Sequence, residues 1–155
     1  MNLDVAIEEV HAAEAELARG LLALGERHKA DHDVYHLTRT LADHARERMK
    51  ALEPHAERYS VSIDSGGVLS ALREKSSELL GRRSEVGLLL LRDMRKLHLL
   101  AAEASINWTI LGQGAQAARD SELLATVTES HPETLRALRW TTTKLKETAP
   151  QVLTS

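Results

Sequence analysis

The 155-residue sequence contains no cysteine, and this absence excludes disulfides, thiol catalysis and zinc or iron–sulfur centres held by cysteine. Aromatic side chains are almost as scarce, since two tyrosines and two tryptophans are the whole set. So few rings cannot build a stacking platform for single-stranded nucleic acid. A net charge of -3 gives no basic surface for nucleic acid either. We therefore expect no nucleic-acid partner.

Long apolar runs are also missing. The most apolar stretch, residues 97–112, contains His98, Glu103 and Asn107, and it is too short and too polar to span a bilayer. The first residues lead directly into a charged segment without the apolar core of a signal peptide. These features predict a cytoplasmic protein with no membrane partner.

Proline occurs only three times, and Ala, Leu, Glu and Arg dominate, so helix propensity is high almost everywhere. The length suits one domain, residues 1–155. Apolar residues spaced three and four apart mark long amphipathic helices. Between the second and third of them, residues 60–67 read as a loop and 68–80 as a short helix. We expect Pro132 to interrupt or bend the last helix and Pro150 to end it. The predicted helices are 3–29, 34–59, 84–118 and 121–148.

The predicted fold class is therefore all-α, an up-down four-helix bundle. Its connections are short, long and short, which gives two helical hairpins joined by a long crossover. The run Leu88 to Leu91 sweeps most of a helical turn, so it cannot all face one bundle interior. We expect either the crossover or a partner subunit to cover it, and we predict a homo-oligomer, a dimer or larger.

Titratable residues interrupt the apolar seams near the middle of each predicted helix. They are Glu14, His44, Glu103 and His131. Two carboxylates and two imidazoles at one height suit a single iron, manganese or zinc ion. The same four residues also suit a closed polar network, with Glu14 paired to His44 and Glu103 to His131. A third interpretation places some of them at the edge of the seam, in contact with solvent.

The chain resembles the ferritin-like superfamily over essentially its whole length, and its small rubrerythrin-like and stress-associated members are nearest in length. The resemblance rests on a mid-helix Glu on the first and third helices, a mid-helix His on the second and fourth, and the phrase Ala12-Ala13-Glu14-Ala15-Glu16-Leu17. Active members carry a Glu-x-x-His motif whose Glu bridges two metal ions. Here Leu41 and Thr128 stand where those carboxylates would be. The resemblance thus implies an incomplete di-metal site, with Glu14, His44, Glu103 and His131 as its remaining ligands.

The function expected from these patterns is a non-enzymatic binding or assembly module with a degraded metal site. One alternative is a mononuclear or di-metal carboxylate-histidine protein acting in iron and oxygen chemistry. Another is a purely structural interaction protein. No catalytic residue is assigned, and the expected cofactor is none or one metal ion. His28, His32 and His36 fall four apart, which on one continuous helix would give a metal-binding face. Asp31 and Asp33 mark a turn at this point, so we expect all three histidines on the surface at one end of the bundle.

Overall fold

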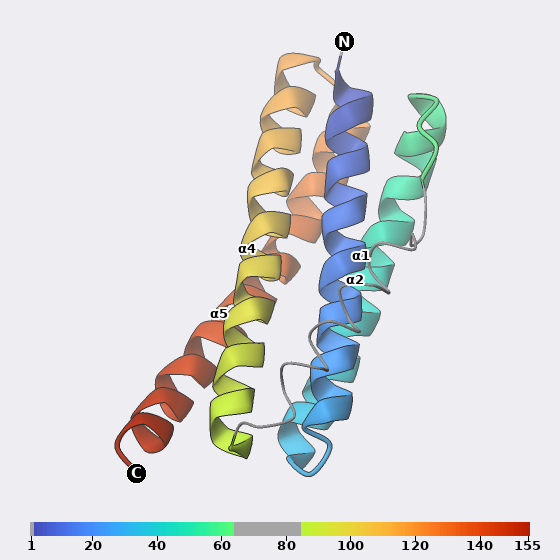
Figure 1. The fold of residues 1–155 in the computed structure, drawn as a ribbon. Helices are drawn as coiled ribbons and strands as arrows, with labels where there is room; N and C mark the ends of the chain where they lie inside the picture. The colour runs from blue at the N-terminus through green and yellow to red at the C-terminus, as the bar shows by residue number, and fades with distance from the viewer. Residues whose placement is uncertain (1, 64–84) are drawn as a thin grey trace.

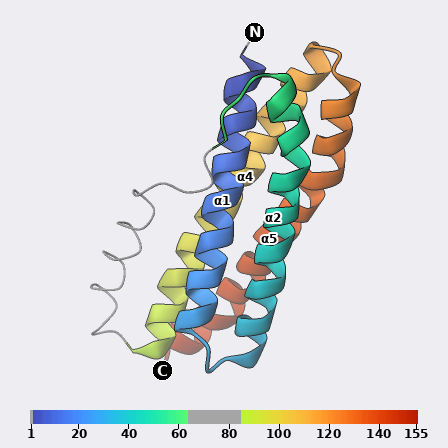
Figure 2. The ribbon, with the colours of Figure 1, turned by 90° about the vertical axis from the view of Figure 1, so that its right-hand side faces the viewer.

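The computed structural model describes residues 2–63 and 85–155, and these form four long helices with no strand among them (Figures 1 and 2). The all-α prediction is confirmed, and the structure is compatible with a four-helix bundle. The predicted helix at 68–80, and the part of the predicted loop beyond residue 63, lie outside the described residues. The helices are α1 (Leu3–Arg27), α2 (His32–Arg58), α4 (Val86–Ala117) and α5 (Ser121–Leu153).

Two aspartates begin the second helix of each hairpin in the same way. The Asp31 side chain accepts a hydrogen bond from the Val34 N–H at 3.2 Å, and Asp120 accepts one from the Leu123 N–H at 3.1 Å. Each satisfies a backbone donor that the first helical turn leaves without an intrahelical partner. The turn expected at Asp31 is confirmed.

The ends of α2 and α4 also share one device. Ser60 and Arg119 adopt left-handed backbone conformations, with φ of 56° and 58°. Each reverses the chain so that the next amide donates to a carbonyl five residues back, from Val61 to Ala56 and from Asp120 to Ala115. This is the Schellman arrangement, which satisfies the last carbonyls of a helix.

The directions of the helices follow from contacts at their ends. Arg27, at the end of α1, contacts Asp93 near the start of α4. His55, near the end of α2, contacts Thr126 near the start of α5. Consequently α2 and α4 run in the same direction, while α1 and α5 run in the opposite one (Figure 1). The packing of α2 on α5 is the least extensive of the four neighbouring pairs, and the C-terminal half of α5 leans away from the bundle.

Two apolar clusters fill the interior, one in each half of the bundle. The cluster nearer the α1–α2 turn is built around Leu17, Leu21, Met94 and Leu97. The cluster nearer the other end is built around Ile7, Val10, Leu52, Trp108 and Leu111. Glu14 lies between them on α1. Within residues 2–63 and 85–155, no helix has an apolar stretch long enough to cross a membrane.

The prediction that Pro150 ends the last helix is wrong, because α5 continues through both Pro132 and Pro150 to Leu153. A proline inside a helix removes one amide donor, but its fixed φ is compatible with helical backbone. Both prolines are exposed, so water can reach the carbonyls that lose their donor. Pro54 is likewise exposed and lies inside α2.

Gly25 and Gly20 give a matched pair for testing how closely the helices approach. A Cβ at Gly25 would collide with Thr38 Oγ1, and that hydroxyl is held by the Val34 carbonyl at 2.8 Å. A Cβ at Gly20 would meet the ends of two leucine side chains, Leu100 at 2.7 Å and Leu97 at 3.4 Å, and the nearer one can turn away. We expect Gly25→Ala to lower the free energy of unfolding by about 1–3 kcal/mol. Gly20→Ala should be neutral or stabilising by up to about 1 kcal/mol, because alanine favours helix. Urea denaturation measures both, and equal effects would contradict the close approach of α1 and α2.

Candidate functional site

The centre of the bundle is a buried carboxylate that all four helices surround. Glu14 on α1 has no exposed surface. Its Oε1 accepts hydrogen bonds from Trp108 Nε1 on α4 at 2.7 Å and from Thr134 Oγ1 on α5 at 2.6 Å. Arg48 on α2 donates from Nε to Oε1 at 3.0 Å and from Nη2 to Oε2 at 2.8 Å. One carboxylate therefore joins three other helices.

Arg48 offsets the free-energy cost of burying the Glu14 carboxylate. Its guanidinium is itself buried and meets Glu14 through two parallel hydrogen bonds, the geometry that arginine and carboxylate share best. Of the four donors to Glu14, three reach Oε1 and one reaches Oε2. The pair is neutral as a unit, and the Arg48 guanidinium holds both carboxylate oxygens.

The structure does not bring the four predicted site residues together. Glu103 is exposed, although the prediction placed it on the seam. His44 is half-buried, and its Nδ1 is enclosed without a hydrogen-bond partner. The Nε2 of His131 shares a hydrogen bond with Ser105 Oγ at 3.0 Å. Among the described residues, no three His, Asp or Glu side chains lie close enough together to hold a metal ion.

The reason is a helical phase error on two helices. The buried positions of α4 include Ala101, Ala104 and Trp108, so the inner face is about one residue away from Glu103. On α2 the buried stripe runs through Leu41, Ala45, Arg48 and Leu52, and Arg48 lies one turn beyond His44. The alternative of a closed polar network has the right form, but its partners are Arg48, Trp108 and Thr134 rather than histidine. The sequence did contain a signal for Arg48, because this arginine falls at the helical spacing of the buried stripe of α2.

His28 is a second correction, because it is buried rather than on the surface. Its Nε2 lies 2.8 Å from Asp93 Oδ2, and Arg27 Nη2 donates to Asp93 Oδ1 at 3.0 Å. His28 directly follows the last residue of α1. At this point its imidazole lies against the first turns of α4, where Asp93 contacts it. His32 and His36 are exposed, as predicted.

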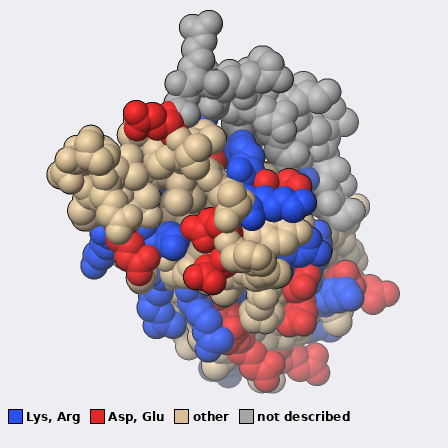
Figure 3. Space-filling view, turned by 90° about the horizontal axis from the view of Figure 1, so that it is seen from below, with Lys and Arg blue, Asp and Glu red and all other residues tan. Residues whose placement is uncertain are grey.

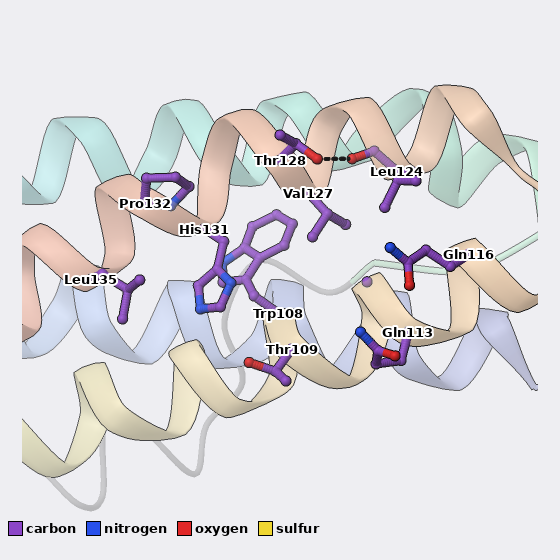
Figure 4. A pocket seen from close by; sticks show the side chains of 11 residues that line it. Trp108, Thr109, Gln113, Gln116, Leu124, Val127, Thr128, His131, Pro132 and Leu135 are labelled. Atoms are coloured by element: carbon purple, nitrogen blue, oxygen red, sulfur yellow. Dashed lines mark hydrogen bonds between the residues drawn. The ribbon is translucent and has the colours of Figure 1, made fainter.

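A shallow cavity of about 330 Å³ lies on the outer side of the network, between α4 and α5 (Figure 4). The Trp108 ring lines it while its Nε1 points inward to Glu14, so one side chain belongs to both sites. His131 also lines the cavity. Burial lowers the pKa of His131, and the negative charge of Glu14 opposes that shift. The imidazole is therefore mainly neutral at pH 7. Its hydrogen-bond partner is the Ser105 hydroxyl rather than a carboxylate. The other lining residues are Thr109, Gly112, Gln113, Gln116, Leu124, Val127, Thr128, Pro132 and Leu135.

Comparison of the chain with protein-family models, curated proteins and solved structures gave no match.

The buried pair gives a direct test of the network. Glu14→Ala leaves the Arg48 cation buried without a counter-charge, so we expect the free energy of unfolding to fall by about 3–5 kcal/mol. Replacing both residues, Glu14→Leu with Arg48→Met, should recover part of that loss, since no unpaired charge remains, although Trp108 and Thr134 still lack their acceptor. Glu26→Gln breaks an exposed ion pair with Lys29 and should change stability by less than about 0.5 kcal/mol. Urea denaturation of the four proteins checks this, and a double variant as unstable as Glu14→Ala would contradict it.

His131 gives a pH test. Because its pKa is lowered in the folded chain, the unfolded chain binds a proton more readily, and stability must fall as pH drops through about 6.5. The pKa values of His11 and His55 are lowered too, mainly by burial, so they act in the same direction. His131→Gln keeps hydrogen-bonding capacity toward Ser105 but cannot titrate. We expect this variant to lose less stability than the wild-type chain between pH 7.5 and 5.5. Identical losses in the two proteins would show that His131 titrates normally.

Proposed function

We propose that this chain is a non-enzymatic assembly module that pairs with a second copy of itself through the outer face of α4. The observation that carries the proposal is a row of large apolar side chains on that face. Leu99, Ile106 and Ile110 have 59%, 61% and 57% of their surface exposed. Apolar residues scattered singly are normal on a protein surface, but a contiguous row is typical of a partner interface.

The spacing puts these residues on one stripe. Leu88, Leu99, Ile106 and Ile110 follow one another at intervals of 11, 7 and 4 residues, and each interval is close to a whole number of helical turns. The stripe is therefore within about 40° of a straight line along α4 and spans about 33 Å. Of the leucine run expected to meet a partner, only Leu88 is exposed, while Leu89 to Leu91 are half-buried.

A second copy is the occupant that the stripe fits, because it is complementary to itself when two helices run antiparallel. Leu88 and Ile106 share one angular position, being five turns apart, and they lie equally far from a point near residue 97. Arg92 and Glu103 share a neighbouring position and are equally far from nearly the same point. A two-fold axis there pairs Leu88 with Ile106 and Arg92 with Glu103, and each pair occurs twice. Opposite charges thus coincide in the register that also pairs Leu88 with Ile106.

For the fold, we propose a relationship to the ferritin-like bundles. Its support is that α2 and α4 run in the same direction, as two hairpins joined by a long crossover require. The proposal does not extend to di-metal chemistry, because Arg48 already occupies the carboxylate of Glu14. Elemental analysis of untagged protein tests the metal alternative. One equivalent of iron, manganese or zinc that is lost in His131→Ala would favour that alternative.

The assembly proposal predicts a dimer by light scattering at micromolar concentration. Ile106→Glu places a charge within the apolar stripe, so the dimer dissociation constant should rise at least about thirtyfold, the effect of a hot-spot residue. Val5→Glu is the matched control, because Val5 is 52% exposed on α1, away from the stripe. That variant should remain dimeric. A strictly monomeric wild-type chain would sink the proposal.

The antiparallel register is tested by exchanging charges. Arg92→Glu alone, or Glu103→Arg alone, places like charges opposite each other twice, and each should weaken the dimer by about tenfold. The double variant restores opposite charges and should regain most of the affinity. If both single variants dimerise as the wild type does, the register is wrong even if the face is right.

A further inference from the structure

We propose that His32 and His36 form a binding site for a divalent transition-metal ion at the start of α2. The two residues lie one helical turn apart, and both side chains are exposed. His36 Nε2 lies 3.1 Å from His32 Nδ1, and the ring planes differ by only 18°. This site is separate from Glu14 and from the α4 stripe, and it depends on neither.

The distance between the two nitrogens matches a shared metal ion. Imidazole nitrogens bind zinc at about 2.0–2.1 Å, so two neighbouring ligands stand about 2.9–3.4 Å apart in octahedral or tetrahedral geometry. The observed 3.1 Å lies within that interval. In this pair one imidazole N–H donates to the other ring nitrogen. When the ion binds at the donor nitrogen, that proton moves by way of solvent to the other nitrogen of the same ring, so both ligands remain neutral imidazoles. Rotation of the two exposed rings is enough to direct both lone pairs at one point.

The positions of the histidines also favour chelation. Histidines four residues apart on a helix face are the spacing by which helical zinc motifs hold their ion. Here α2 fixes that spacing, and the Asp31 cap fixes the first turn. The ring of Tyr35 stands edge-on to His36 with 5.4 Å between centroids. The helix backbone therefore holds the two imidazoles on one face, and rotation of the rings alone completes the chelate.

Charges of both signs surround this position, since Lys29 and Arg39 lie over the Tyr35 ring and aspartates flank His32. The positive end of the α2 dipole is offset by Asp31 and Asp33, which flank His32. The end of the bundle that holds the α1–α2 turn shows acidic and basic side chains interleaved rather than a field of one sign (Figure 3). Selectivity must then come from the ligands themselves. Imidazole nitrogen suits zinc, nickel and copper, whereas magnesium and calcium prefer oxygen.

The test is calorimetric titration of the untagged full-length chain with zinc chloride. We expect one ion per chain, and no binding heat with magnesium chloride. His32→Ala and His36→Ala should each weaken zinc binding at least about tenfold, because a chelate loses one of its two protein ligands. The matched control combines His36→Ala with Leu37→His. It keeps the number of histidines but turns the second imidazole by about 100°, so it should not recover affinity.

Thermal melting gives a second readout, because an ion that binds only the folded chain raises Tm. Zinc should raise the Tm of the wild-type chain and leave that of His32→Ala and His36→Ala unchanged. Three results would overturn the proposal. They are no zinc binding by the wild type, equal affinity in the single variants, or full affinity in the control with the displaced histidine.

Discussion

The hydrogen bonds to the Glu14 carboxylate are the constraint on which the rest of the bundle depends. A charge without exposed surface is stable only if it is paired and its acceptor positions are filled, and here the donors come from α2, α4 and α5. Sliding any of these helices by one residue would turn its donor by about 100° and leave the carboxylate short of a partner. Apolar contacts alone tolerate such slips far better, because they are not directional. We infer that the network selects one rotation for each helix, while the two apolar clusters supply most of the stabilisation.

Trp108 couples this centre to the surface. Its indole nitrogen donates to Glu14, and its ring lines the outer cavity beside His131. A change in the cavity therefore reaches the buried pair through one side chain. The charge of Glu14 in turn acts on the His131 imidazole, although burial dominates its pKa. Among the described contacts, the only hydrogen-bond partner of the His131 side chain is the Ser105 hydroxyl.

Much of the fold could be predicted from the sequence, and the site only in part. Apolar spacing and the turn at Asp31 placed the four helices to within a few residues of their ends, except where α5 passes Pro150. Glu14 was recognised as a core residue because it interrupts a regular apolar stripe. Arg48 was missed because arginine is exposed in most proteins, so a lone arginine on a stripe carries little weight. Its partners on α4 and α5 could not be found, since phase on one helix says nothing about which side chain faces it from another.

The misplaced phase of α4 shows why hydrophobicity alone misleads in this chain. Small residues such as Ala101 and Ala104 hold the buried seam, which lets α4 approach its neighbours closely, whereas Leu99, Ile106 and Ile110 point outward. A pattern that gives large apolar residues to the core therefore chooses the wrong face. The helix is apolar on both sides, and a helix of that kind is normally enclosed by protein. The described part of the chain encloses only one side of it. Pairing of two chains through α4 would bury the other side and place this helix at the centre of the assembly. A helix with apolar residues on both sides is stable in such a buried position.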